Sequence, residues 1–336
     1  MEENIDNPLQ GKNLRSRVAL NKFKNLLIGQ PDVNAIGIGR RRVKGKETGE
    51  ICLKAFVPQK LPEKILPAWR ILPKSLPVDG HKVMVDVEEM EKAIVPNFNI
   101  SAMQTTISSK EASPLLPVPM QPGQSSANII SDVGTVCIYA RRKGQIGTHR
   151  RFFISCNHVF SSLNLAPIGT PIIAPARLDG GIYPYNQIGN LINFIPLWFG
   201  PLYNNFCDAA LAYTLQEKGG INKVKDIGII KELGSIQSLE DNPVVYKTGR
   251  TTGVTSGTVV AASASIKVDY WALGSYGVNT VFHNQIITTH MGAYGDSGSL
   301  LINHQQRAVG MLFAGSATHT FFNPLHLILQ AFELEI

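Results

Sequence analysis

The chain has no long hydrophobic run, and this absence excludes a helical membrane anchor. Its best candidate for a membrane span, Leu191 to Leu202, is interrupted by Pro196 and Pro201 and is shorter than the roughly 20 residues that a bilayer requires. The first residues are acidic and lack the apolar segment of a secretory signal. We therefore expect a soluble, cytoplasmic protein with no membrane partner.

Cysteine is also scarce, and its spacing excludes a disulfide framework. The four cysteines show no C-x-x-C motif and no close pairing: Cys52, Cys137, Cys156 and Cys207. We expect reduced thiols, as in proteins of a reducing compartment.

Charge is modest but unevenly distributed. Charged residues make up 17% of the chain and hydrophobic residues 44%, which is ordinary for a globular protein and excludes wholesale disorder. Residues 1 to 74 carry 15 Lys and Arg against 7 Asp and Glu, so this segment has a charge of +8 and the rest of the chain, at a whole-chain charge of +7, is near neutral. This segment is either a solvated basic face or a docking site for a partner. Nucleic acid is disfavoured as that partner, because no aromatic residues interleave the basic ones.

The chain divides into three segments of different composition. Residues 1–100 are predicted to form a small α+β module, in which apolar spacing over Leu14 to Ile28 predicts a helix that ends before Pro31. Residues 101–130, rich in Pro and Ser, are predicted to be a linker. Residues 131–336 consist of short β-rich runs separated by Gly and Asn, which is typical of a barrel or sandwich.

The segment Gly295-Asp296-Ser297-Gly298 is the most informative motif. Glycines on both sides allow a tight turn that projects the Ser297 hydroxyl. They also leave the N–H groups of Gly295 and Ser297 pointing toward one place, as in an oxyanion hole. A structural turn is the alternative interpretation. The Gly-x-Ser-x-Gly elbow is excluded because position 299 is Ser.

Two further residues complete a candidate catalytic set. His158 follows the apolar run 152–156, and Asp208 precedes the small-residue run 209–212. A serine hydroxyl is a poor nucleophile unless a base takes its proton and a third group orients that base. We assign these roles to His158 and Asp208. The alternatives are a packed histidine and a turn aspartate.

The chain order of these residues is His, Asp, Ser, which is the order of the chymotrypsin type. Residues 131–336 resemble a trypsin-like, chymotrypsin-fold serine protease, most closely the intracellular group of the plant narrow-leaf protease and its bacterial relatives. The motifs that carry the resemblance are Gly134-Thr135-Val136, residues 155–159, 208–210, Lys247 to Gly253, 295–300 and 310–315, with 35–39 and 48–50 in the N-terminal module. Cys156 stands where this group usually has Asn.

The resemblance implies a mainly β protein with a chymotrypsin-like double β-barrel, preceded by the α+β module. The first barrel would span about residues 131–230 and the second about 240–336. The triad would lie between them, with His158 and Asp208 from the first barrel and Ser297 from the second. The implied activity is hydrolysis of a protein or peptide substrate, with no cofactor and no metal.

The resemblance also implies a substrate pocket with Met291 at its base. Its walls would come from Ala314, Gly315 and Ser316, with His319 nearby. Because Met291 carries no charge, the pocket favours an apolar or small side chain over Lys or Arg. Recognition of an acidic side chain by His290 or His319 is the alternative.

Two questions stay open on the sequence alone. Asp296 needs a partner, which in secreted zymogens is a newly cut N-terminus. Here either another group satisfies Asp296 or cleavage in the linker activates the protein. The domain could also be a protease-like scaffold whose basic N-terminal module binds a protein or nucleic acid.

Overall fold

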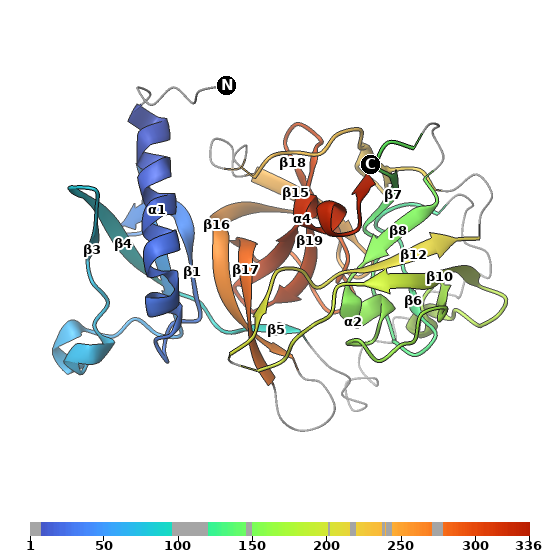
Figure 1. Ribbon diagram of the computed structural model, residues 1–336, viewed down its shortest axis with the longest axis horizontal. Coiled ribbons are helices and arrows are strands. Elements are labelled where there is room, and N and C mark those ends of the chain that lie inside the picture. Colours follow the sequence, from blue (N-terminus) through green and yellow to red (C-terminus); the bar gives the residue numbers. More distant parts are fainter. Residues whose placement is uncertain are drawn as a thin grey trace.

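The computed structural model describes residues 8–95, 120–145, 150–200, 202–215, 220–236, 239, 244–270 and 278–336. Within these ranges the chain is mainly β (Figure 1). Most of the predicted linker, residues 101–119, lies outside the described ranges. In its remaining part, the short strand β6 (Ala127–Asn128) pairs antiparallel with β9 (Pro171–Ile173).

The N-terminal module is a helix packed on a sheet. Its elements are α1 (Pro8–Ile28), β1 (Ala35–Val43), β2 (Lys46–Val57), β3 (Ser75–Val78) and β4 (His81–Glu89). Leu20 and Leu27 of α1 are buried against Ile36 and Leu53 of the sheet. The proline-rich stretch between β2 and β3 holds only two short 3-10 turns, Glu63–Ile65 and Ala68–Arg70, because proline interrupts regular hydrogen bonding. The predicted helix is confirmed and begins six residues earlier than its apolar spacing indicates.

The first β-unit is one seven-stranded sheet with the order β21-β7-β8-β12-β10-β9-β6. Its remaining strands are β7 (Ile138–Arg142), β8 (Phe152–Ser155), β9 (Pro171–Ile173), β10 (Gln187–Phe194), β12 (Ala210–Thr214) and β21 (Leu334–Glu335). Strand β21 reaches this sheet from the C-terminus of the chain, after helix α4 (Leu325–Ala331). The last residues therefore tie the second β-unit back to the first.

The second β-unit closes into a six-stranded barrel, β16-β17-β20-β19-β18-β15, because β16 pairs with both β15 and β17. These strands are β15 (Val244–Gly249), β16 (Gly253–Tyr270), β17 (Val278–Thr289), β18 (Leu300–Asn303), β19 (Ala308–Gly315) and β20 (His319–Pro324). Three further short strands are β11 (Asn204–Asn205), β13 (Lys223–Val224) and β14 (Gly228–Ile229).

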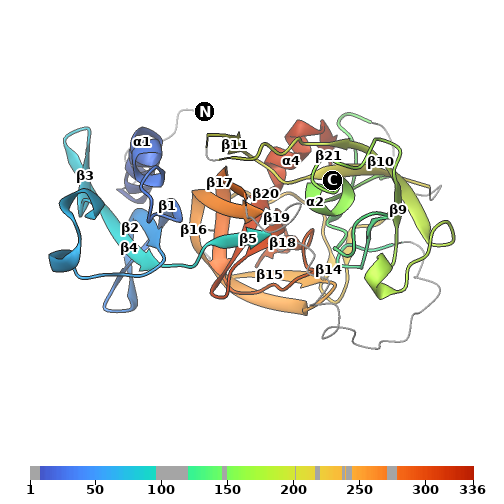
Figure 2. The ribbon, with the colours of Figure 1, turned by 90° about the horizontal axis from the view of Figure 1, so that it is seen from below.

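The N-terminal module is joined to this barrel by strand pairing. Strand β1 pairs antiparallel with β16, so the module's sheet continues that of the second barrel (Figure 2). A second connection is β5 (Ala93–Val95), which pairs with the ends of β16 and β19. The predicted mainly β class with a small helix-containing N-terminal module is thus confirmed. Among the described residues, no helix is both long and apolar enough to cross a bilayer.

The junction of β1 and β16 predicts a stability effect. A Cβ at Gly39 would overlap the Val260 carbonyl oxygen and lie 2.9 Å from Lys54 Cδ. We expect Gly39→Ala to lower the free energy of unfolding by about 1–3 kcal/mol, the usual cost of overpacking. Urea titration measures this, with Gly49→Ala in β2 as the control, since a Cβ there meets nothing within 4 Å. Equal effects of the two substitutions would contradict the close approach of β1 to β16.

Candidate active site

His158 and Asp208 are held together by two hydrogen bonds. His158 lies on the single helical turn α2 (Asn157–Phe160), directly after β8, and Asp208 lies just before β12. The Nδ1 atom of His158 is 2.6 Å from Asp208 Oδ2, and the His158 backbone N–H donates to Oδ1 at 3.2 Å. Because β8 and β12 are neighbouring strands, the sheet itself brings these residues together. The carboxylate fixes the tautomer with hydrogen on Nδ1, which leaves Nε2 as the basic nitrogen.

Asp208 is also held by the second barrel. Its side chain is fully buried, and Oδ2 accepts a second hydrogen bond from Tyr270 Oη at 2.7 Å. The Asp208 backbone N–H donates to Asn323 Oδ1 at 3.1 Å. Burial, and then the Asp208 charge, raise the pKa of Tyr270 well above its usual value, so Tyr270 stays a proton donor. A buried carboxylate is costly without such partners.

Ser297 lies on the loop before β18, and this loop packs on the first β-unit. The Ser297 carbonyl accepts a hydrogen bond from the Thr135 N–H at 2.8 Å. At Gly298, where φ is +98°, a Cβ would overlap Thr135 O and Ser155 Oγ. Ser155 ends β8, three residues before His158. The structure therefore places the Ser297 loop against the end of the strand that leads to His158.

Two peptide groups in this loop are oriented by hydrogen bonds to their carbonyl oxygens. The backbone carbonyl oxygen of Tyr294 accepts a hydrogen bond from Thr251 Oγ1 at 2.6 Å. The backbone carbonyl oxygen of Asp296 accepts one from Ser299 Oγ at 2.6 Å and one from the Ser299 N–H at 2.9 Å. In a planar trans peptide the N–H points opposite to the C=O. The N–H groups of Gly295 and Ser297 are therefore directed away from these donors, and neither has an acceptor among the described residues. Such a pair suits an oxyanion.

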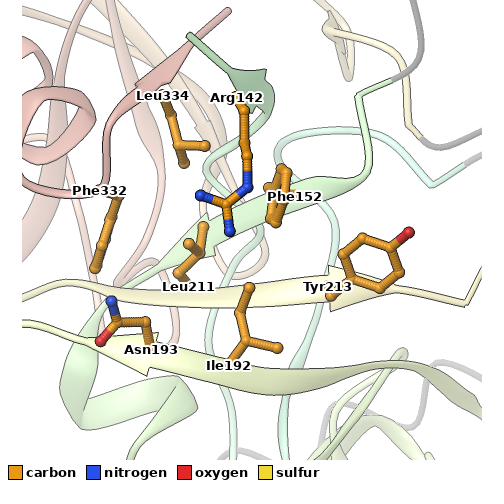
Figure 3. A pocket seen from close by; sticks show the side chains of 8 residues that line it. All are labelled: Arg142, Phe152, Ile192, Asn193, Leu211, Tyr213, Phe332 and Leu334. Carbon is orange, nitrogen blue, oxygen red and sulfur yellow. The ribbon is translucent and has the colours of Figure 1, made fainter. Parts of the chain in front are cut away.

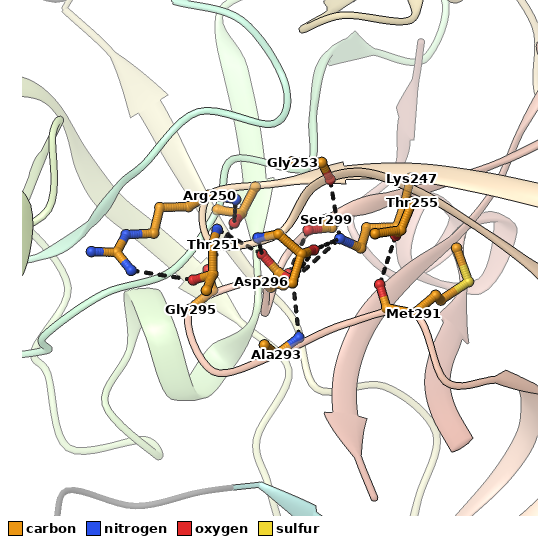
Figure 4. Close-up of polar contacts among 12 residues, drawn as sticks. Lys247, Arg250, Thr251, Gly253, Thr255, Met291, Ala293, Gly295, Asp296 and Ser299 are labelled. Carbon is orange, nitrogen blue, oxygen red and sulfur yellow. Dashed lines mark hydrogen bonds and ion pairs between the residues drawn. The ribbon is translucent and has the colours of Figure 1, made fainter. Parts of the chain in front are cut away.

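Asp296 is satisfied from within the chain (Figure 4). Its buried carboxylate lies 3.2 Å from the equally buried Lys247 ammonium. It also accepts the N–H groups of Thr251 at 2.8 Å and Ala293 at 3.0 Å, and the Thr252 hydroxyl at 2.6 Å. Burial lowers the pKa of Lys247, and the Asp296 charge opposes that shift. The cation that the sequence left unidentified is thus Lys247, and no cut N-terminus is needed to pair with Asp296.

The same region has three potential metal ligands, Cys156, His158 and Asp208, whose donor atoms lie within 4.8 Å of one another. The Cys156 Sγ donates to Leu312 O at 3.1 Å, and burial, followed by the Asp208 charge, raises its pKa well above the usual value. A neutral thiol is a weak metal ligand, and the His158–Asp208 bond already uses the facing atoms of those two side chains. All four cysteines are buried and free.

The predicted pocket residues occur in two neighbouring places. Met291 is only 3% exposed and packs into the barrel core, with its N–H donated to Thr320 Oγ1. Ala314 and Gly315 end β19, and the Ser316 hydroxyl accepts the N–H of His319 at 3.1 Å. Burial, then nearby positive charges, lower the pKa of His319 to about 4. His319 is therefore uncharged at neutral pH.

A separate cavity of about 510 Å³ lies on the first sheet, between β7, β8, β12 and β10 and the C-terminal residues (Figure 3). Its lining includes none of His158, Asp208 and Ser297. The Arg142 guanidinium lies 5.4 Å from the centre of the Phe152 ring there. The cavity is therefore not part of the candidate active site.

No known protein family matches this chain, and neither does any curated protein. Among solved structures, it is similar to trypsin- and chymotrypsin-fold serine proteases. Protease A of Thermobifida fusca is 18% identical with a TM-score of 0.45, and 64% of this chain and 98% of that one are covered. Cellulomonas bogoriensis chymotrypsin is 19% identical with a TM-score of 0.44, covering 65% and 98%. A Nocardiopsis protease is 18% identical with a TM-score of 0.44, covering 64% and 98%. These values say nothing of the chemistry, which rests on the side chains described above.

Several residues of this site were not assigned by sequence reasoning. Tyr270 ends a long strand, and no spacing rule connects it to Asp208. The roles of Lys247 and Thr251 were also missed, although their motif was recognised. The available signal for a partner of Asp296 was Lys247, which begins a turn rich in Gly and Thr upstream of the serine motif.

The buried ion pair predicts a loss of stability together with a change in the reactivity of Ser297. Lys247→Met would leave the Asp296 charge buried without its cation, which typically costs about 3–5 kcal/mol. We expect thermal unfolding at a lower temperature and slower labelling of Ser297 by a fluorophosphonate, because Asp296 holds the loop that carries both N–H groups. Lys223→Met, at an exposed lysine of β13, is the control. Unchanged unfolding in Lys247→Met would contradict this role.

His319 predicts a pH dependence of stability. Its pKa falls from 6.5 to about 4 on folding, so between these values the unfolded chain binds a proton that the folded chain does not. Its contribution to stability is therefore complete above about pH 6.5 and is lost as the pH falls toward 4. We expect His319→Gln to weaken the acid destabilisation seen in urea titrations at pH 7.5 and 4.5. His304→Gln, at an exposed histidine, should follow the wild type. Parallel pH curves for all three proteins would refute the assignment.

Proposed function

We propose that the protein is a trypsin-like serine endopeptidase that cleaves peptide bonds through Ser297, His158 and Asp208. The observation that carries the proposal is the 2.6 Å bond from His158 Nδ1 to the fully buried Asp208 carboxylate, beside a serine loop with two directed N–H groups. A buried carboxylate that orients a histidine base is the arrangement that activates a serine nucleophile.

The first half of the reaction forms an acyl-enzyme. Ser297 Oγ attacks the carbonyl carbon of the scissile bond while His158 Nε2 takes the hydroxyl proton. The negative charge that develops on the carbonyl oxygen is stabilised by the N–H groups of Gly295 and Ser297. Each such donor is typically worth about 2.7–4 kcal/mol in the transition state. When the C–N bond breaks, the His158 imidazolium returns the proton to the departing amine.

The second half of the reaction hydrolyses that ester. Water attacks the acyl carbon while His158 Nε2 takes a proton from that water. His158 then gives this proton to Ser297 Oγ as the ester bond breaks, and the acid product leaves. Asp208 keeps its negative charge throughout and stabilises the imidazolium. Tyr270 acts on the reaction through Asp208, as a positioning residue. Side chains and water transfer every proton in this cycle, so the proposed chemistry uses no cofactor.

We propose an apolar or small side chain as the residue bound before the cleaved bond. The proposed pocket, Met291, Ala314, Gly315, Ser316 and His319, contains no acidic group, which disfavours Lys and Arg. Since burial keeps His319 uncharged at neutral pH, it offers no cation to an acidic substrate side chain.

The wider biological setting is proposed from the sequence motifs. They favour a narrow-leaf-type protease acting on a selected intracellular protein, with the N-terminal module, about residues 1–100, recruiting a partner. Several basic side chains of the module are in ion pairs, including Arg41 with Glu50 at 2.9 Å and Lys54 with Glu88 at 2.6 Å. These pairs reduce the free positive charge for nucleic acid. The alternative, a protease-like scaffold, requires an inactive Ser297.

Replacement of the nucleophile is the direct test. We expect Ser297→Ala to lower the turnover of fluorescein-labelled casein by on the order of 10⁶, as in other triads, with an unchanged unfolding temperature. Ser256→Ala, at an exposed serine of β16, should turn over casein like the wild type. Turnover by Ser297→Ala at the wild-type rate would refute the proposal.

A further inference from the structure

Strand β5 lies beside the proposed active site and has no part in the chemistry described above. It pairs parallel with the end of β16, where Val95 is opposite Tyr270. It pairs antiparallel with the end of β19, where Ile94 is opposite Gly315. Ala93 and Val95 are buried. Figure 2 shows β5 reaching from the N-terminal module to the second barrel.

Strand β5 and the Ser297 loop occupy the same edge of β19. The other edge of β19 pairs with β20 from Gly310 to Gly315. On the shared edge, β18 pairs with the N-terminal part of β19, from Ala308 to Met311. The Leu312 N–H then donates to Ser299 O at 2.9 Å, and the Leu312 oxygen accepts the Gly298 N–H at 2.8 Å. Strand β5 comes next along this edge, at Gly315.

The direction of β5 leads toward the nucleophile. Leu312 and Gly315 are three residues apart, about 10 Å along an extended strand. Because β5 is antiparallel to β19, its course from Ile94 to Val95 runs back along β19 toward Leu312 and the Ser297 loop. A polypeptide bound for cleavage at Ser297 by strand addition to this edge would need the same N–H and C=O groups.

Other contacts hold the neighbourhood of β5 in place. Glu91 Oε2 accepts the Ala317 N–H at 3.2 Å, just beyond the end of β19. The Phe56 ring of the N-terminal module lies edge-on to His319, with 6.0 Å between ring centres. The module therefore contacts the same surface as β5, and β5 has support outside its own three residues.

We propose that β5 is an intramolecular occupant of the edge on which a polypeptide substrate pairs, so that a substrate must displace β5 to reach Ser297. This inference rests on the proposed function. One strand edge cannot pair with two chains at once. The apparent affinity for a substrate is therefore the intrinsic affinity multiplied by the fraction of molecules in which β5 is released, and it falls as that fraction falls. The substrate class is an extended segment of polypeptide that competes for β19 through its backbone.

A reversible lock tests this inference. In Ile94→Cys/Gly315→Cys, the new thiols lie on directly paired residues, whose Cα separation of about 4.5–5.5 Å suits a disulfide. A Cβ at Gly315 is 3.9 Å from its nearest contact, His319 O, and the native cysteines are all buried. Ile94→Pro, which removes an N–H from β5, provides the opposite perturbation.

Two probes of Ser297 are compared in each protein by intact-mass spectrometry. One is a small fluorophosphonate, which needs no strand pairing, and the other is an Ala-Ala-Ala diphenyl phosphonate. We expect oxidation of the double variant to slow the tripeptide probe at least tenfold relative to the small one, and reduction to reverse this. Ile94→Pro should accelerate the tripeptide probe relative to the small one. Each single cysteine variant, tested with and without oxidant, is the control.

The two proposals fail in distinguishable ways. If the small probe labels Ser297 but the relative rate of the tripeptide probe is the same in the locked, reduced and Ile94→Pro proteins, the role of β5 is refuted. If the tripeptide probe labels none of the proteins, including Ile94→Pro, the role of β5 is refuted as well. If the small probe labels none of the proteins, the proposed function itself fails.

Discussion

The structure depends on the burial of one carboxylate, Asp208, at the junction of the two β-units. An unpaired charge in such a place is costly, so the surrounding chain must supply partners. The first sheet supplies His158, through both its ring and its N–H, and the second barrel supplies the Tyr270 hydroxyl. The buried charge is therefore stabilised partly by His158, the proposed base, and it holds the His158 ring in one orientation. Stability and proposed chemistry have the same origin here.

A second buried carboxylate, Asp296, organises the serine loop in a similar way. Lys247 and the neighbouring turn surround it with one cation and several hydrogen bonds. The result is a loop whose peptide groups are oriented by the protein's own hydrogen bonds, as electrostatic stabilisation of a transition state requires. For the proposed activity, access of a substrate to this loop is then the step left to control. Strand β5 lies on the edge of β19 where such control would act.

The sequence predicted the features that depend on local pattern. Apolar spacing gave the N-terminal helix, and short runs between glycines gave the mainly β class. The candidate roles of His158, Asp208 and Ser297 were predicted because glycines and strand ends mark their motifs, and the structure pairs His158 with Asp208. Tyr270 and β5 were not found, since their roles come from pairing between strands far apart in the chain. The Lys247 motif was visible, but its partner could be identified only once the turn was placed against Asp296.

The central claim is that Ser297 is an activated nucleophile, and covalent labelling tests it most directly. Wild type and Ser297→Ala would be treated with a fluorophosphonate, which a nucleophilic serine attacks at phosphorus with loss of fluoride, and their intact masses compared. The account predicts one adduct on the wild type, mapped to the peptide that contains Ser297, and none on the variant. An unlabelled wild type, or equal labelling of both proteins, would contradict it.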